Sequence, residues 1–139
     1  MSNSISGGCL CGAVRYECDA EPVAFLICHC RDCRYVSGGN AAAVVIAPKP
    51  AFCITSGEDN VRGHTSDSDK GNQVTRQFCV QCGTPLFSKL HAMPDVWGIK
   101  AGSLDDASRL TPSATLWTST AYSWALIHED IPRFEKDPS

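Results

Sequence analysis

The chain has 139 residues, with 15 acidic and 12 basic side chains, so its formal net charge is −3. This length fits a modest core, and we expect residues 1–139 to form a single domain. Lys and Arg are scattered along the chain, so the basic patch of a nucleic-acid-binding protein is missing. The chain opens without the basic and apolar regions of a signal peptide, and no apolar run of about 18 residues follows. We therefore expect a cytoplasmic protein with neither nucleic acid nor a membrane as partner.

Most predicted elements are short strands. Ala13–Cys18 alternates apolar and polar residues, as a half-buried strand does, and Asn40–Ala47 is a run of small and β-branched residues typical of a buried strand. Six further candidates are separated by Gly, Pro, Asp and Ser residues: Phe52–Thr55, Val61–His64, Val74–Phe78, Pro85–Lys89, Val96–Ala101 and Ser113–Trp117. This pattern predicts a mainly β fold of several short strands.

Helical periodicity is limited to one short turn. It runs from Cys30 to Val36, and Ser37–Gly39 should end it, because glycine accepts the left-handed conformation of a C-cap. The segment Thr65–Asn72 is polar and charged throughout, so we expect an exposed hairpin loop there. Of Trp97, Trp117 and Trp124, at least two should fill the core.

Cysteine is unusually frequent, with nine in the chain. A reducing compartment keeps cysteines as thiols or metal thiolates, so disulfides are the weaker explanation. Cys18 and Cys53 stand alone, and the other seven fall into three tight clusters: Cys9 with Cys11, Cys28 with Cys30 and Cys33, and Cys79 with Cys82.

The CxxC pair Cys79 and Cys82 is followed by Gly83, whose positive φ lets backbone N–H groups point at sulfur, as in a zinc knuckle. A redox CxxC usually opens a helix, whereas Thr84-Pro85 leads into a predicted strand here. A closed tetrahedral site needs two more ligands, and Cys9 and Cys11, flanked by glycines, can supply them. This predicts a four-thiolate structural zinc site.

The CxCxxC cluster of Cys28, Cys30 and Cys33 has no further cysteine pair to complete it. Three thiolates with an open fourth position are expected of a zinc ion that binds substrate, and their negative charge favours thiol chemistry over water activation. One alternative closes the site with a fourth ligand from Cys18, Cys53, His29, His64 or His91. Another combines Cys30 and Cys33 with Cys79 and Cys82. Arg31, Asp32 and Arg34 lie on the same predicted turn, and Arg34 is a candidate contact for a carboxylate.

Taken in order, these motifs resemble the family of glutathione-dependent formaldehyde-activating enzymes, which includes the centromere protein V domain. The resemblance covers nearly the whole chain. It rests on Gly7–Tyr16 (GGCLCGAVRY), Cys28–Arg34 (CHCRDCR) with Ser37 and Gly38, Phe78–Phe87 (FCVQCGTPLF), Ala101–Asp106 (AGSLDD) and Ile131–Phe134 (IPRF).

The resemblance implies a β-tent fold with two zinc ions per chain. The structural ion would be bound by Cys9, Cys11, Cys79 and Cys82, and the catalytic ion by Cys28, Cys30 and Cys33. The implied reaction joins formaldehyde to glutathione as S-(hydroxymethyl)glutathione, a carbon–sulfur lyase activity. The stretch Val61–Asn72 departs from the compact family pattern, so a different thiol or a bulkier aldehyde is an alternative substrate.

Two other functions compete with this one. A zinc-stabilised binding module or chaperone of the same fold would need only the four-cysteine site, and the additional CxCxxC cluster argues against it. A methionine sulfoxide reductase would need a metal-free nucleophilic cysteine in the C-terminal part, but no cysteine follows Cys82.

Overall fold

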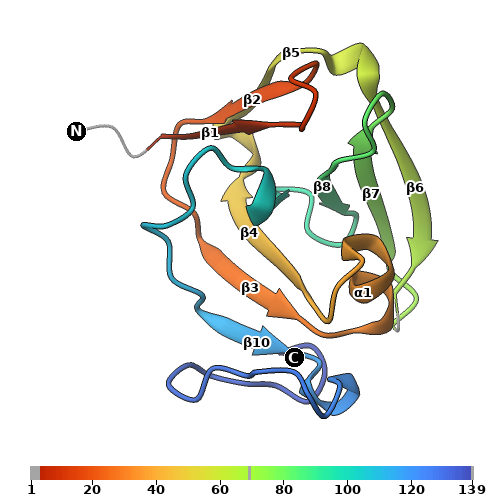
Figure 1. The fold of residues 1–139 in the computed structure, drawn as a ribbon, viewed down its shortest axis with the longest axis vertical. Coiled ribbons are helices and arrows are strands. Elements are labelled where there is room, and N and C mark those ends of the chain that lie inside the picture. The colour runs from red at the N-terminus through yellow and green to blue at the C-terminus, as the bar shows by residue number, and fades with distance from the viewer. Residues whose placement is uncertain (1–3, 69, 139) are drawn as a thin grey trace.

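The computed structural model describes residues 4–68 and 70–138, and within them the chain forms ten strands and one α-helix (Figure 1). The smaller sheet has three antiparallel strands in the order β1-β2-β5. Their bounds are Ile5–Gly8 for β1, Arg15–Cys18 for β2 and Phe52–Ser56 for β5. This sheet forms the upper layer in Figure 1.

The larger sheet has seven strands in the order β10-β3-β4-β9-β8-β7-β6. All neighbours are antiparallel except β10 and β3, which run parallel. The bounds are β3 Ala24–Cys28, β4 Ala42–Pro48, β6 Val61–Asp67, β7 Gln73–Cys79, β8 Pro85–Leu90, β9 Val96–Lys100 and β10 Ala114–Leu116. The predicted mainly β fold is thus confirmed.

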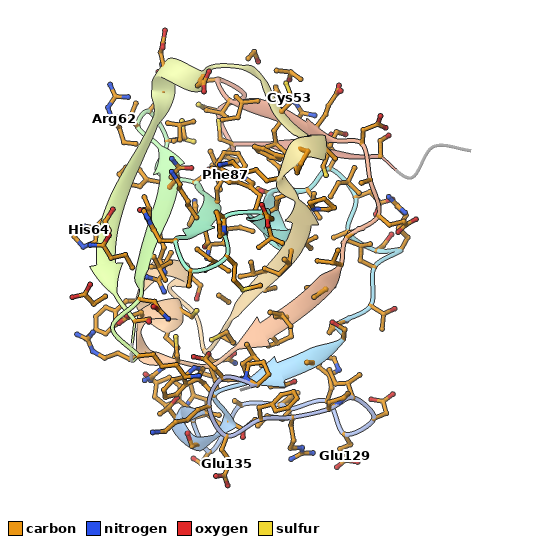
Figure 2. The ribbon with its side chains drawn as sticks, turned by 180° about the vertical axis from the view of Figure 1, so that it is seen from behind. Cys53, Arg62, His64, Phe87, Glu129 and Glu135 are labelled. Carbon is orange, nitrogen blue, oxygen red and sulfur yellow. The ribbon has the colours of Figure 1, made fainter. Side chains whose placement is uncertain are left out.

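The main core lies between the two sheets. Tyr16 and Phe52 from the small sheet meet Phe87 and Trp97 from the large one, with ring centroids 5.1 to 5.8 Å apart. Figure 2 shows Phe87 in the interior of the molecule, where its side chain is fully buried. Such aromatic contacts add to the hydrophobic stabilisation that holds the sheets together.

The helix α1 (Arg31–Ser37) covers the opposite face of the large sheet. Its buried residue, Cys33, packs in a second apolar cluster with Ala42, Val44 and Ile46 of β4. Gly38 ends the helix with φ 74°, and its N–H donates to the Arg34 carbonyl, as the sequence predicts. None of the described helices is long and apolar enough to cross a membrane. Short 3₁₀ turns occur at Lys49–Ala51, Glu58–Asn60, Ala101–Ser103 and Thr118–Thr120.

Two sequence expectations about the strands and loops need correction. The strands β1 and β3 were not predicted, because Ser and Gly fill β1 and the apolar run of β3 has no alternation. The expected loop Thr65–Asn72 is shorter, since β6 pairs with β7 as far as Asp67 opposite Gln73. Because β6 is the edge strand of its sheet, one of its edges is unpaired and polar residues are compatible with strand structure there.

The tryptophans also differ from the expectation that at least two fill the core. Only Trp97 is buried among the three, Trp117 is half-buried and Trp124 is 66% exposed. The Trp124 ring stacks on Tyr122 at 5.1 Å in the C-terminal segment. That segment runs beside β10, where the Thr115 N–H donates to the Pro132 carbonyl. Its aromatic residues therefore belong to a surface layer.

Candidate metal centres

The first cysteine cluster forms where two tight turns meet. Cys9 and Cys11 lie between β1 and β2, whereas Cys79 ends β7 and Cys82 lies in the turn between β7 and β8. The Leu10 N–H donates to the Thr84 hydroxyl oxygen at 3.0 Å, which joins the two turns directly. All four sulfur atoms lie within 4.8 Å of one another.

The sulfur geometry of this cluster fits a tetrahedral zinc ion. With Zn–S bonds of about 2.3 Å, neighbouring sulfurs in a regular tetrahedron lie about 3.8 Å apart. The Sγ atom of Cys11 is 3.6 Å from that of Cys9 and 3.9 Å from that of Cys79. Four cysteine ligands are also the donor set that structural zinc prefers. This cluster could therefore hold a zinc ion.

Local hydrogen bonds favour thiolates at Cys9 and Cys82 in these turns. The predicted positive φ of Gly83 is confirmed at 78°, and its N–H closes the turn on the Cys79 carbonyl at 2.7 Å. Hydrogen bonds from the side chain and backbone of Thr84 lower the pKa of the Cys82 thiol to about 5. The Val14 N–H points at Cys9 Sγ from 3.2 Å. Donors aimed at sulfur favour its charged form.

The second cluster forms at the junction of β3 and α1. Cys28 ends the strand, Cys30 is the N-cap of the helix and Cys33 lies in its first turn, so that all three sulfurs are within 4.8 Å of one another. The Cys33 N–H donates to Cys30 Sγ at 3.3 Å, so this sulfur takes the place of the usual capping oxygen. The helix thus begins inside the cysteine cluster, as the sequence predicts.

The proposed alternatives for closing this second cluster are not formed. Within the described residues, no further cysteine or histidine joins the three sulfurs. The two clusters are separate, so Cys30 and Cys33 do not combine with Cys79 and Cys82. Cys53 is exposed on the small sheet, and His91 Nε2 lies 2.8 Å from the Thr75 hydroxyl. His29 is buried, with Nδ1 at 3.2 Å from the Asn40 carbonyl oxygen.

Comparison with known proteins decides the family. The model of the family described as "Glutathione-dependent formaldehyde-activating enzyme" matches residues 4–120. The chain belongs to this family. A solved structure of a Rhodobacter sphaeroides protein is similar in fold, with a TM-score of 0.60 and 21% sequence identity, covering 75% of this chain and 91% of that one.

Lys100 lies near the three cysteines and was missed by sequence reasoning, because it belongs to none of the motifs that indicate the family. Lys100 on β9 pairs with Val44, which packs in the cluster containing Cys33, and its side chain is almost buried. Burial lowers the pKa of Lys100, while the Cys33 thiol acts in the opposite direction. The available sequence signal was a charged residue at the end of an otherwise apolar strand.

Arg76 on β7 is the second cation that sequence reasoning missed. The pKa of Cys30 is lowered first by the thiols of Cys28 and Cys33 and also by the charge of Arg76. Arg34 places its guanidinium 4.4 Å from the centre of the Tyr122 ring, and its contact with a carboxylate stays a prediction. The charges of Arg76 and Lys100 therefore both reach the three-cysteine cluster, a feature that the family match alone does not reveal.

Proposed function

We propose that this chain is a zinc-dependent enzyme of the carbon–sulfur lyase type, which adds a thiol, glutathione in the first instance, to a small aldehyde such as formaldehyde. The observation that carries the proposal is the three-cysteine cluster, which no fourth cysteine or histidine joins among the described residues. Membership of the formaldehyde-activating enzyme family supports the same reaction class. Zinc in both cysteine clusters is part of the proposal.

The reaction needs no oxidant or reductant. The thiol loses its proton, its sulfur forms a bond to the aldehyde carbon, and the π pair of the carbonyl bond moves to oxygen, which takes up a proton. Zinc bound by Cys28, Cys30 and Cys33 would supply the positive charge that lowers the pKa of the substrate thiol. Holding thiol and aldehyde together then accelerates the addition by proximity.

The residues around the cluster fit this role. Three thiolates and one divalent ion carry a net charge of about −1. Lys100 is nearly buried, and within the described part of the chain no carboxylate lies within 4.0 Å of it. A buried ammonium group needs a counter-charge. In our proposal the cysteine thiolates provide this counter-charge, and Lys100 in turn keeps them deprotonated.

The deciding experiment mixes protein, glutathione and formaldehyde and follows the exchange between free and adducted glutathione by NMR. We expect exchange above the uncatalysed rate for the wild type and only the uncatalysed rate for Cys30→Ser. Cys53→Ser is the matched control, because Cys53 is exposed and lies outside both clusters. A wild-type protein that does not accelerate the exchange would refute the formaldehyde assignment.

Metal analysis tests the zinc part separately. Our proposal requires two zinc ions per chain in the wild type and one in Cys30→Ser. A wild-type content of one ion, retained in Cys30→Ser, would instead favour a zinc-stabilised binding module, which needs only the four-cysteine site.

A further inference from the structure

A hollow of about 580 Å³ opens between α1 and the β6–β7 hairpin. The helix contributes Arg31, Asp32 and Tyr35 to its wall, and the hairpin contributes His64, Ser66 and Arg76. The helix also carries Cys33 and is capped by Cys30, although none of the residues that line the hollow is a cysteine. Figure 1 shows α1 next to the end of β6. The extended hairpin therefore lies opposite the helix that begins in the three-cysteine cluster.

The cations of this hollow differ in how their charge is satisfied. Arg31 makes an ion pair with Asp32 at 3.1 Å and lies over the Tyr35 ring at 4.7 Å. Arg76 is half-buried and donates from Nη1 to the Ser66 hydroxyl at 3.2 Å. Within residues 4–68 and 70–138, no carboxylate oxygen lies within 4.0 Å of Arg76. A partly desolvated guanidinium with unused donors is suited to bind an anion.

Strand register connects Arg76 to the cysteines. Arg76 pairs with Ser88, and Ser88 pairs with Gly98, which in turn pairs with Ile46. Directly paired residues point to the same face of a sheet. Ile46 packs in the same cluster as Cys33, so Arg76 lies on the sheet face that α1 covers. A ligand bound to Arg76 can therefore extend along this face toward the three sulfurs.

We propose that Arg76 binds a carboxylate carried by one of the two reactants, so that the enzyme selects an anionic substrate. This inference rests on the proposed function, because it assigns the second binding point of the same reaction. The carboxylate has two chemical sources, the thiol or an aldehyde acid. A bidentate guanidinium–carboxylate pair contributes about 1.5–3 kcal/mol, so the expected preference is about 10- to 100-fold.

The test compares substrates that differ only in their carboxylates. In the thiol series, glutathione and its diethyl ester react with formaldehyde. In the aldehyde series, glyoxylate and glycolaldehyde react with N-acetylcysteamine, a thiol without a carboxylate. Each pair is measured with the wild type, Arg76→Gln and Arg62→Gln. Arg62 is the matched control, since it is exposed on β6 and donates to the Asp59 carbonyl rather than lining the hollow.

We expect Arg76→Gln to lose the preference in kcat/KM for the carboxylate form in one series, which identifies the source, while Arg62→Gln keeps it. A wild type without any such preference would overturn the proposal. So would an Arg76→Gln variant that keeps it in both series, or one that slows acid and ester equally.

A binding measurement separates this inference from the proposed function. S-methylglutathione, its diethyl ester and glycolate are titrated into zinc-loaded protein and followed by NMR. We expect at least one of the two acids, S-methylglutathione or glycolate, to bind the wild type and Arg62→Gln about 10- to 100-fold more tightly than Arg76→Gln. If this difference appears without any turnover, Arg76 is an anion site and the proposed reaction is wrong. If no acid binds the wild type more tightly than Arg76→Gln, the anion site is wrong whatever the turnover.

Discussion

Replacement of Cys82 by serine should destabilise the fold far more than replacement of Cys30. The four-cysteine cluster joins the turn after β1 to the turn after β7, across a separation of 68 residues between Cys11 and Cys79. Treated as a cross-link, closure of a loop of this length stabilises a folded chain by about 4 kcal/mol. For a chain of this size, each kcal/mol changes Tm by about 3–4 °C. Cys82→Ser should therefore lower Tm by roughly 15 °C.

Cys30→Ser should have a smaller effect for two reasons. The three-cysteine cluster spans only residues 28–33, and closing so short a loop contributes about 2 kcal/mol at most. Serine is also a favourable N-cap, so the hydrogen bond that Cys33 N–H donates to position 30 is retained. We expect Tm to fall by less than about 7 °C.

The assay is thermal unfolding followed by circular dichroism, with zinc content measured on the same samples. Cys53→Ser serves as the control, because it removes an exposed cysteine outside both clusters. Equal Tm shifts for Cys82→Ser and Cys30→Ser, with one zinc ion lost from each, would show that the two sites do not differ in structural role.

Three further predictions follow from single residues. Gly57→Ala should fail to fold stably, because Gly57 has φ 80° and the added Cβ would lie 1.8 Å from the Ala13 carbonyl oxygen. Gly71→Ala is the control, since Gly71 has φ 81° but no neighbour within 4 Å of the added Cβ. It should lower the free energy of unfolding by only about 1–2 kcal/mol in urea denaturation. Hydrogen bonds from Arg15 and Ser6 lower the pKa of Asp105, so its stabilisation is present above the unfolded pKa of about 3.9 and is lost as pH falls through the lower folded value. The Arg15 and Asp105 side chains are 41% and 48% exposed, so Asp105→Asn should lose at most about 1 kcal/mol at pH 7 and nothing near pH 2 in denaturation curves. Equal losses at both pH values would contradict this. Lys100→Met should weaken zinc binding at the three-cysteine site about tenfold in competition with a chromophoric chelator, while the four-cysteine site stays unchanged.

The cysteine clusters and the helix were predictable because their signals are local. Cys30, Cys33 and Gly38 lie within nine positions of one another, and their spacing alone indicates a capped turn that begins among thiols. The pairing of Cys9 and Cys11 with Cys79 and Cys82 was also accessible, because a tetrahedral site needs four ligands. In contrast, β3 is a short, wholly apolar run without alternation, and such a run does not distinguish a strand from a helix.

The cations near the second cluster could not be predicted, because their position depends on strand order. Lys100 reaches the cysteines only because β9 lies next to β4, and Arg76 only because β7 and β8 follow on the same side. No local pattern relates residues 28, 76 and 100. The sequence shows each cation as one charge among many, and only the register places both on the face that α1 covers.

The two clusters differ in what a metal ion can contribute to the fold. An ion bound by turns from two different sheets reduces the freedom of about half of the unfolded chain, and its binding energy is folding energy. The three-cysteine ligands all come from residues 28–33, where strand β3 and helix α1 already hold them close together. Three nearly adjacent thiols repel one another strongly once they ionise, even beside the buried Lys100. Closing so short a loop stabilises the fold only slightly, because it removes little entropy from the unfolded chain. Stability alone therefore gives a weak reason for this second cluster, whereas a reaction that needs an activated sulfur gives a direct one.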